Sequence, residues 1–166
     1  MLFLPIAEVC MNAGPTGQGG ILSTGAAMQP SPSPLAASDG QFGRWQAVNV
    51  ETRELVWDHR KEAPPTSAAL STEGGLVFIG ALDQSFSALD DATGEVLWST
   101  DLGDIPASFP ITYQVGDKQY IAVAIGTPTI HANVWLGVTQ EYFGANRNFA
   151  GSLSRQGPSL KVFALN

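Results

Sequence analysis

Basic residues, paired cysteines and long apolar runs are scarce in this sequence. Eight Lys and Arg stand against fifteen Asp and Glu, and the formal net charge is -7. A nucleic-acid-binding surface needs clustered basic side chains that neutralise phosphates. The basic residues here are scattered along the chain, so we expect neither nucleic acid nor an anionic membrane surface as a partner.

The sequence also lacks a membrane span and a secretion signal. No apolar run reaches the roughly 18 residues that a spanning helix requires. The apolar start, residues 1–7, has no positive charge before it and is interrupted by Pro5, so it does not predict a signal peptide. We expect it to lie in a core strand instead. A chain that opens within a strand suggests a protein truncated at its N-terminal end.

Cysteine and histidine are too few to predict a disulfide or a metal centre. Cys10 is the only cysteine, and we expect it to be a small buried apolar residue. With only two histidines and no metal-ligand spacing, no metal site is predicted within this chain. His59 follows Asp58, and we interpret these two residues as a surface pair.

Glycine and proline are abundant, at 18 and 11 residues, and they favour turns and short strands over long helices. Residues 12–43, which hold many of them, and residues 127–158 are predicted to be irregular excursions. The run Gly17-Gln18-Gly19-Gly20 is similar to a phosphate loop. However, no strand leads into it and no Gly-Lys-Ser/Thr follows, so phosphate binding is not predicted.

A repeated turn organises the rest of the chain. Residues 88–98 predict a tight turn between two strands, with Asp90 and Gly94 in the turn and Trp98 in the second strand. Residues 47–57 repeat this pattern 41 positions earlier, with Arg53 in place of Gly94. Because Arg53 carries a Cβ, the first copy should have a more strained or a different turn. A period near 40 with a tryptophan-bearing hairpin is typical of a β-propeller.

Short apolar runs between turn signals predict the other strands. The last of them, residues 161–166, is similar to residues 85–90, which lie 76 positions earlier and precede the second turn. We expect strands at 2–6, 76–80, 85–89, 95–100, 111–113, 120–125 and 161–166. We interpret the tryptophans of both turns as docking neighbouring sheets together, and Asp90 and Asp91 as turn acids rather than a catalytic pair.

These motifs together resemble the C-terminal part of the pyrroloquinoline quinone (PQQ)-dependent alcohol dehydrogenases, an eight-bladed β-propeller family with tryptophan-docking repeats. The repeat Ala-x-Asp-x-x-x-Gly-x-x-x-Trp is matched by Ala88, Asp90, Gly94 and Trp98. Further matches follow in the order of the family: Cys10-Met11, residues 71–80, Pro110 to Tyr113 with Gln119 to Val123, and residues 162–165. The resemblance implies an all-β chain, residues 1–166, that forms about two to three of the eight blades apart from the two excursions.

The resemblance also implies a function. The family oxidises an alcohol to an aldehyde with PQQ and calcium, in the periplasm, and passes electrons to a cytochrome-type acceptor. Its catalytic Asp and calcium ligands come from earlier blades with no counterpart here, so we expect no catalytic residue in this chain and no activity from it alone. The cofactor-binding positions that the resemblance implies are Ala7, Thr66 with its neighbour Ser67, and Ile130 and His131 on a loop that reaches over the quinone.

Two alternatives remain open at this point. Non-enzymatic propeller scaffolds of the outer-membrane assembly type use similar repeats to bind protein partners. A split enzyme, in which a separate chain supplies the missing N-terminal blades, would also fit the sequence. The sequence upstream of Met1 would distinguish them, since metal ligands and a vicinal cysteine pair favour the enzyme and a lipoprotein signal favours the scaffold.

Overall fold

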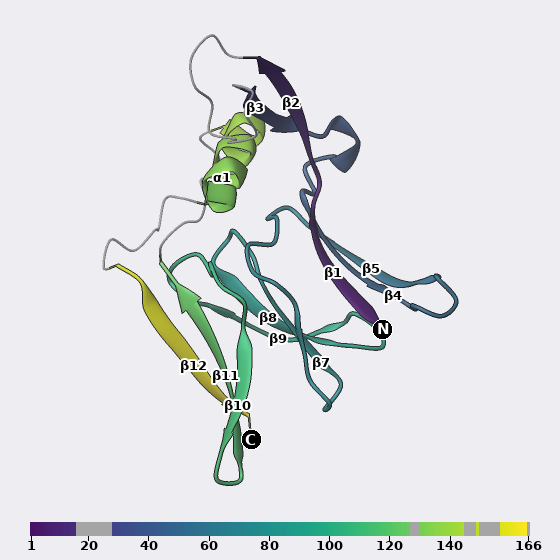
Figure 1. Ribbon diagram of the computed structural model, residues 1–166, viewed down its shortest axis with the longest axis vertical. Helices are drawn as coiled ribbons and strands as arrows, with labels where there is room; N and C mark the ends of the chain where they lie inside the picture. The colour runs from purple at the N-terminus through teal and green to yellow at the C-terminus, as the bar shows by residue number, and fades with distance from the viewer. Residues whose placement is uncertain (16–27, 127–129, 145–148, 150–156, 166) are drawn as a thin grey trace.

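The computed structural model describes residues 1–15, 28–126, 130–144, 149 and 157–165 (Figure 1). Three antiparallel sheets follow one another along the chain. The first sheet has the order β1 (Leu2–Ala7), β4 (Gly43–Val48), β5 (Leu55–Lys61). The second has the order β6 (Leu70–Ser71), β7 (Leu76–Gly80), β8 (Ser85–Asp90), β9 (Val96–Asp101). The third has the order β10 (Ile111–Val115), β11 (Lys118–Ile125), β12 (Ser159–Leu165).

The two turns predicted as repeats have the same structure. In each, a polar side chain at the end of a strand accepts hydrogen bonds from the backbone two and three residues later. The acceptor is Asn49 in the first sheet and Asp90 in the second. Gly94 has a φ of 74°, and Arg53 at the same position has a φ of 63°. The expected strain at Arg53 is therefore present, because left-handed backbone is unfavourable for a residue with a Cβ.

The first sheet docks on the second through Trp57. Its Nε1 donates a hydrogen bond to the backbone oxygen of Asp91 at 2.9 Å, and its ring lies against Gly94. Around it, apolar side chains of both sheets form one core that includes Trp45, Val77 and Leu89. The predicted docking role of Trp57 is confirmed at this joint.

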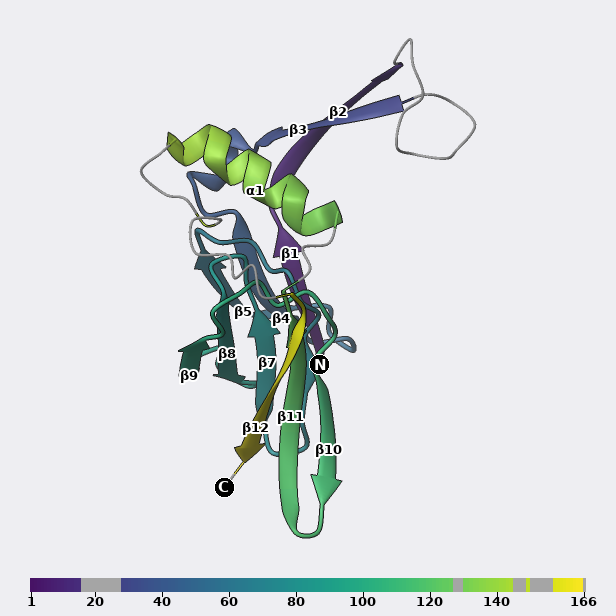
Figure 2. The same cartoon turned by 90° about the vertical axis from the view of Figure 1, so that its left-hand side faces the viewer.

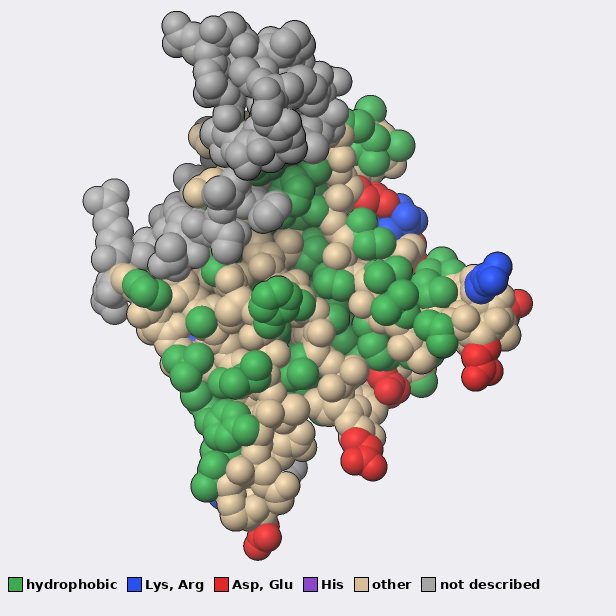
Figure 3. Space-filling model, in the orientation of Figure 1, with side chains coloured by type: hydrophobic (Ala, Val, Ile, Leu, Met, Phe, Trp, Pro, Cys, Tyr) green, Lys and Arg blue, Asp and Glu red, His purple; other side chains and the backbone are tan. Residues whose placement is uncertain are grey.

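The second and third sheets share a separate core. Phe78 and Phe86 of the second sheet pack with Ile121 and Val123 of the third, and Phe86 stacks on Phe163 with ring centroids 5.9 Å apart. Figure 3 shows hydrophobic side chains over the third sheet on the visible face and acidic side chains at the tips of hairpins. The three sheets thus form a row joined by two apolar layers, as consecutive propeller blades do.

The two excursions that the sequence predicted as irregular contain regular structure. Residues 12–43 include the rest of a hairpin, β2 (Val9–Pro15) and β3 (Met28–Pro34), and a short helix, η1 (Ala36–Ser38). Residues 127–158 include the helix α1 (Ile130–Phe143). The described chain is therefore mostly β rather than all-β. The prolines in β3 concealed that strand, and the lack of an acidic residue in the first turn of α1 and of a basic residue in its last turn concealed the helix.

The first excursion lies between β1 and β4, and the second lies between β11 and β12. In both sheets these two strands occupy the positions that β7 and β8 occupy in the second sheet. In the second sheet this connection is the short turn at residues 81–84. The two insertions therefore rise from the same end of the row (Figure 2). Phe42, at the end of the first insertion, packs edge-on against Tyr142 and Phe143 of α1, with ring centroids 5.2 and 5.9 Å away. Among the described helices none is long and apolar enough to cross a membrane.

Candidate cofactor site

A cavity of about 340 Å³ lies at the end of the row from which the insertions rise. Strand β1 and the loops that lead into β6 and β10 form its wall, together with Ala132 and Trp135 of α1. Three of the predicted cofactor-binding residues, Ala7, Thr66 and Ser67, line this cavity together. The remaining lining residues are Pro5, Pro65, Ala68, Ala107 and Phe109.

The other two predicted residues lie next to the cavity along the chain. Ile130 and His131 are the first residues of α1, directly before Ala132. The sequence placed them on a loop, and the structure places their backbone in a helix instead. Their side chains lie outside the part that the structure describes, so their binding role stays a prediction.

The loops that form the wall repeat with the same 41-residue period as the turns. Ser67 Oγ accepts a hydrogen bond from the Gly80 amide at 2.7 Å, and Ser108 Oγ accepts one from the Ala124 amide at 2.9 Å. Both loops begin with Pro-x-Ser, since Pro65 aligns with Pro106. This signal would have identified Ala107 and Phe109, which the sequence analysis missed.

Ser67 and Thr66 differ in what their hydroxyls are free to do. The Ser67 hydroxyl accepts from Gly80 and donates to the backbone oxygen of Ala68 at 2.9 Å, so it holds the loop in place. Oγ1 of Thr66 is buried and has no hydrogen-bond partner among the described residues. A buried hydroxyl without a partner costs about 1–3 kcal/mol. Thr66 is therefore the polar group of this wall that a ligand or a water molecule would satisfy.

Apart from Thr66, Ser67 and backbone groups, the lining residues are apolar, and none of them is charged. Phe109 is 80% exposed and stands at the edge of the cavity, and none of the lining residues is Lys, Arg or His. Such a wall suits the flat face of an aromatic ligand with a hydrogen-bond acceptor near Thr66. It does not neutralise a negative charge on the ligand.

Glu8 and three charged residues of the first sheet, Arg44, Asp58 and Arg60, pair with one another outside the cavity. Glu8 bridges Arg44 and Arg60 at 2.8 and 2.9 Å, and Asp58 pairs with Arg44 at 3.1 Å. The predicted Asp58–His59 surface pair is therefore wrong, because the Asp58 carboxylate faces an arginine across the sheet.

His59 instead stacks on Trp45, with ring centroids 5.3 Å apart. Partial burial, and next the charge of Lys61, lower the pKa of His59 below its ordinary value, against a smaller raising effect of Asp58. Cys10 is half-buried rather than buried as predicted. Neither residue lines the cavity.

No group of three or more His, Cys, Asp or Glu side chains within the described ranges is arranged to hold a metal ion. The calcium that the resemblance implies thus has no candidate ligand set among these residues. The cavity wall contains hydroxyl and backbone groups but no carboxylate.

Comparison with known proteins decides the family. The profile of the family described as "PQQ: Glucose/ethanol/alcohol dehydrogenase, beta-propeller domain" matches residues 13–121. The chain belongs to this family. The match includes β4 and β5 of the first sheet, the whole second sheet and the first part of the β10–β11 hairpin, and it confirms the resemblance seen in the turns.

Several curated quinoproteins are similar to this family member. It is 39% identical over 88 residues to the quinoprotein alcohol dehydrogenase PedE of Pseudomonas putida, which covers 53% of the chain and 14% of that relative. It is 30% identical over 134 residues to the 1-butanol dehydrogenase (cytochrome c) of Thauera butanivorans, covering 81% of the chain and 19% of the relative. The chain therefore spans less than a fifth of the length of each of these relatives.

Solved structures of the same class share the fold. A europium-containing methanol dehydrogenase matches 98% of the chain and 30% of its own length, with a TM-score of 0.74 at 26% identity. The quinohemoprotein alcohol dehydrogenase of Comamonas testosteroni matches 60% of the chain and 15% of its own length, with a TM-score of 0.50 at 29% identity. The prediction of a partial quinoprotein propeller is confirmed.

Proposed function

We propose that this chain forms one wall of the PQQ pocket in an alcohol dehydrogenase that oxidises an alcohol to an aldehyde. The observation that supports this most directly is the cavity itself. Ala7 is distant in the sequence from the adjacent residues Thr66 and Ser67, the resemblance names all three as cofactor neighbours, and they line one cavity.

The wall fits one part of the cofactor. PQQ is a flat aromatic quinone that carries carboxylates. The uncharged wall, with the Thr66 hydroxyl unpartnered among the described residues, matches the ring and an acceptor oxygen. When bound, PQQ takes up the hydride of the alcohol with the help of a metal ion. Thr66 would donate a hydrogen bond to the cofactor, the small side chain of Ala7 leaves room for it, and α1 shields this side from water. The carboxylates need cations from outside this wall.

Catalysis requires more than this chain. We propose that the other blades, whether upstream in the same polypeptide or in a separate chain, supply the catalytic Asp and the metal ligands. The metal is calcium or a lanthanide, since one relative, from Methylacidiphilum fumariolicum, is named a lanthanide-dependent methanol dehydrogenase. A small alcohol as substrate, a cytochrome-type electron acceptor and a periplasmic location belong to the same proposal.

Titration of the purified chain with PQQ tests the pocket, with quenching of tryptophan fluorescence as the readout. We expect saturable binding that the Thr66→Val variant weakens about tenfold, which corresponds to about 1.4 kcal/mol for a lost hydrogen bond. Thr112→Val, on exposed β10 away from the cavity, is the matched control. Equal binding by all three proteins would place PQQ elsewhere. We expect no PQQ-dependent dye reduction by the chain alone, and measured reduction would overturn the need for further blades.

A further inference from the structure

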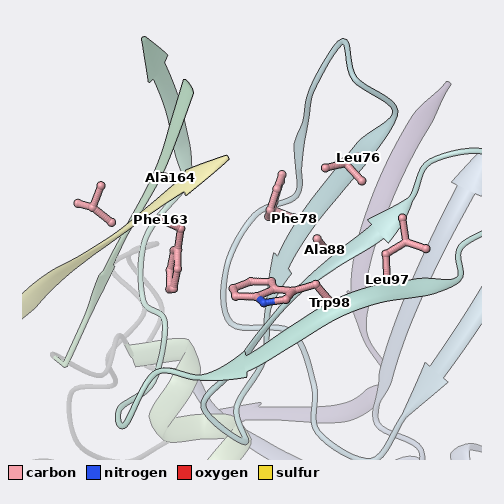
Figure 4. A pocket seen from close by; sticks show the side chains of 8 residues that line it. Leu76, Phe78, Ala88, Leu97, Trp98, Phe163 and Ala164 are labelled. Carbon is pink, nitrogen blue, oxygen red and sulfur yellow. The ribbon is translucent and has the colours of Figure 1, made fainter. Parts of the chain in front are cut away.

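The interface between the second and third sheets is apolar in its middle and polar at one end. Figure 4 shows the apolar part, with Phe78, Trp98 and Phe163 between the two sheets. A polar cavity of about 280 Å³ lies where β11 ends and β12 begins, at the end from which the second insertion rises. It shares no lining residue with the cofactor cavity. Its lining residues are Leu102, Gly103, Asp104, Ile125, Gly157, Ser159 and Lys161.

Asp104 is buried at this cavity with one of its carboxylate oxygens unpaired. The residue is 1% exposed. Its Oδ1 accepts a hydrogen bond from the Ile105 amide at 2.7 Å, whereas its buried Oδ2 has no partner among the described residues. A buried carboxylate is strongly unfavourable unless a cation or a hydrogen-bond donor compensates it. A positively charged donor is therefore the group that Oδ2 lacks.

The backbone around Asp104 is held in place by the third sheet. The Gly126 amide donates a hydrogen bond to the Ile105 oxygen at 3.2 Å, and the Ala107 amide donates one to the Ala124 oxygen at 3.1 Å. The Ile105 side chain is fully buried in the core. The carboxylate is thus presented from a fixed loop, which lowers the cost of ordering it around a ligand.

Lys161 brings the opposite charge from the third sheet. Ser159, Lys161 and Phe163 alternate along β12 and therefore share a face. Phe163 stacks on Phe86, so this face is turned toward the second sheet. Lys161 forms no ion pair with any described residue. The cavity therefore has an acid on one side and a base on the other that do not pair with each other.

The chain closes the equivalent place between the first and second sheets with its own side chains. There the Lys61 ammonium lies 2.8 Å from the Asp83 carboxylate and donates a hydrogen bond to Ser85 Oγ at 2.6 Å. At the offsets of 41 and 76 residues, the counterparts of Lys61, Asp83 and Ser85 are Leu102, Ser159 and Lys161. This set contains no carboxylate and has leucine where the first joint has its lysine. The acid of the second joint is Asp104, whose counterpart in the first is Ala63.

We propose that the polar cavity binds a small zwitterion, an α- or β-amino acid. Its ammonium group donates to Asp104 Oδ2, as the Lys61 ammonium does to Asp83, and its carboxylate pairs with Lys161. Hydrogen bonds between charged groups are the stronger kind. A ligand with only a positive charge would leave Lys161 facing a like charge, and a ligand with only a negative charge would face Asp104. This inference does not depend on quinone binding.

Titration of the ¹⁵N-labelled full chain with glycine and with β-alanine tests the site by nuclear magnetic resonance. With at least one of the two we expect saturable shifts of the Gly103, Ile105, Ser159 and Lys161 amide signals. Methylammonium and acetate, which each carry only one of the two charges, should bind at least tenfold more weakly. The Asp104→Asn and Lys161→Gln variants should each weaken binding of the amino acid at least tenfold.

Matched control variants lie at the opposite end of the third sheet. Asp117→Asn, in the turn between β10 and β11, and Lys118→Gln, at the start of β11, remove the same charges outside the cavity. We expect both to bind as the original chain does. They also separate binding from the general stabilisation that an excluded osmolyte gives, because that effect would be the same in every variant.

Three results would overturn the proposal. The first is the absence of saturable shifts with both amino acids at millimolar concentration. The second is binding of methylammonium or acetate as tight as that of the amino acid, which would assign the cavity to a simple ion. The third is unchanged affinity in Lys161→Gln. If Asp104→Asn does not fold, as judged by circular dichroism, Lys161→Gln and the single-charge probes decide.

Discussion

Gly94 is the residue on which the best-defined joint of the molecule depends. It combines a φ of 74° with a position directly against the indole ring of Trp57. We expect Gly94→Ala to lower the free energy of unfolding by about 2–4 kcal/mol, because backbone strain and overpacking add. Urea denaturation measures this loss.

Gly103 provides a matched control for that experiment. Its φ is 76°, but a Cβ at this position would meet nothing within 4 Å. Gly103→Ala should therefore cost only the strain of the left-handed backbone, about 1–2 kcal/mol. Equal losses in the two variants would show that the contact with Trp57 contributes nothing.

His59 gives the stability a dependence on pH. Burial and Lys61 lower its pKa, so the unfolded chain binds a proton at a pH where the folded chain does not. The contribution is complete above the ordinary value of 6.5 and is lost as the pH falls toward the lowered pKa. We expect the His59→Phe variant, which keeps a ring against Trp45, to show a flatter decline of unfolding free energy below that pH.

Asp90 responds in a different pH range and serves as an internal reference. Hydrogen bonds from the Thr93 hydroxyl and amide lower its pKa below 3.8, so its contribution is lost only as the pH falls below that value. If the free energy of unfolding declines near pH 6 equally in the original chain and in His59→Phe, His59 is not the source of this pH dependence.

The sequence indicated which residues lie together better than it indicated what each side chain does. Ala7, Thr66 and Ser67 were placed near the cofactor by resemblance, and the structure brings them to one cavity. Their different roles could not be predicted. The Ser67 hydroxyl holds the loop by accepting from the Gly80 amide, which is distant in the sequence, whereas the Thr66 hydroxyl has no partner among the described residues. The interpretation of Asp58 with His59 failed because neighbours on a strand point to opposite faces.

At the scale of elements, the Pro-x-Ser loops attach the cavity wall to the sheets. The Ser67→Ala change removes the acceptor of the Gly80 amide, which is buried. We expect it to lower the free energy of unfolding by about 1–3 kcal/mol and to increase hydrogen exchange at Gly80. Ser71→Ala, at an exposed position of β6, should leave both quantities unchanged.

The apolar runs and the repeat predicted the strands of the three sheets except β6, because alternation and turn residues are local signals and β6 has only two residues. The elements that were missed depend on distant contacts. α1 contains Gly137 and β-branched residues and has no acidic residue in its first turn or basic residue in its last. The packing of its end against Phe42 supplies what the local sequence does not.

At the scale of the whole molecule, the third sheet has fewer strand–strand pairings than the second among the described residues. β8 has neighbours on both sides, and β12 has one among the described strands. We therefore expect the amides of β12 to exchange at least tenfold faster than those of β8 in native-state hydrogen exchange. β4, which also lies between two strands, is the control and should match β8. Equal protection of β8 and β12 would show that the row of sheets opens as one unit.

The sequence predicted the family and the row of blades from the repeat, because docking turns specify how one sheet meets the next. It did not predict that the two insertions leave the sheets at the same end, or that α1 in the second insertion lines the cavity. Both insertions follow a strand that occupies the position of β7 in its sheet, namely β1 and β11, and they therefore leave the sheets at the same end. The sequence does not reveal this shared position, because it requires the strands of different sheets to be compared.

The prolines of β3 have a consequence for how the protein aggregates. Pro30, Pro32 and Pro34 alternate with serines and have no N–H, so the serines donate to β2 and the outer edge of β3 offers no donors at the proline positions. This edge is closed to amyloid-like growth, whereas β12 has only its charged Lys161 to discourage it. Fibrils of this protein, if they form under stress, should therefore grow from an edge such as that of β12 rather than from β3.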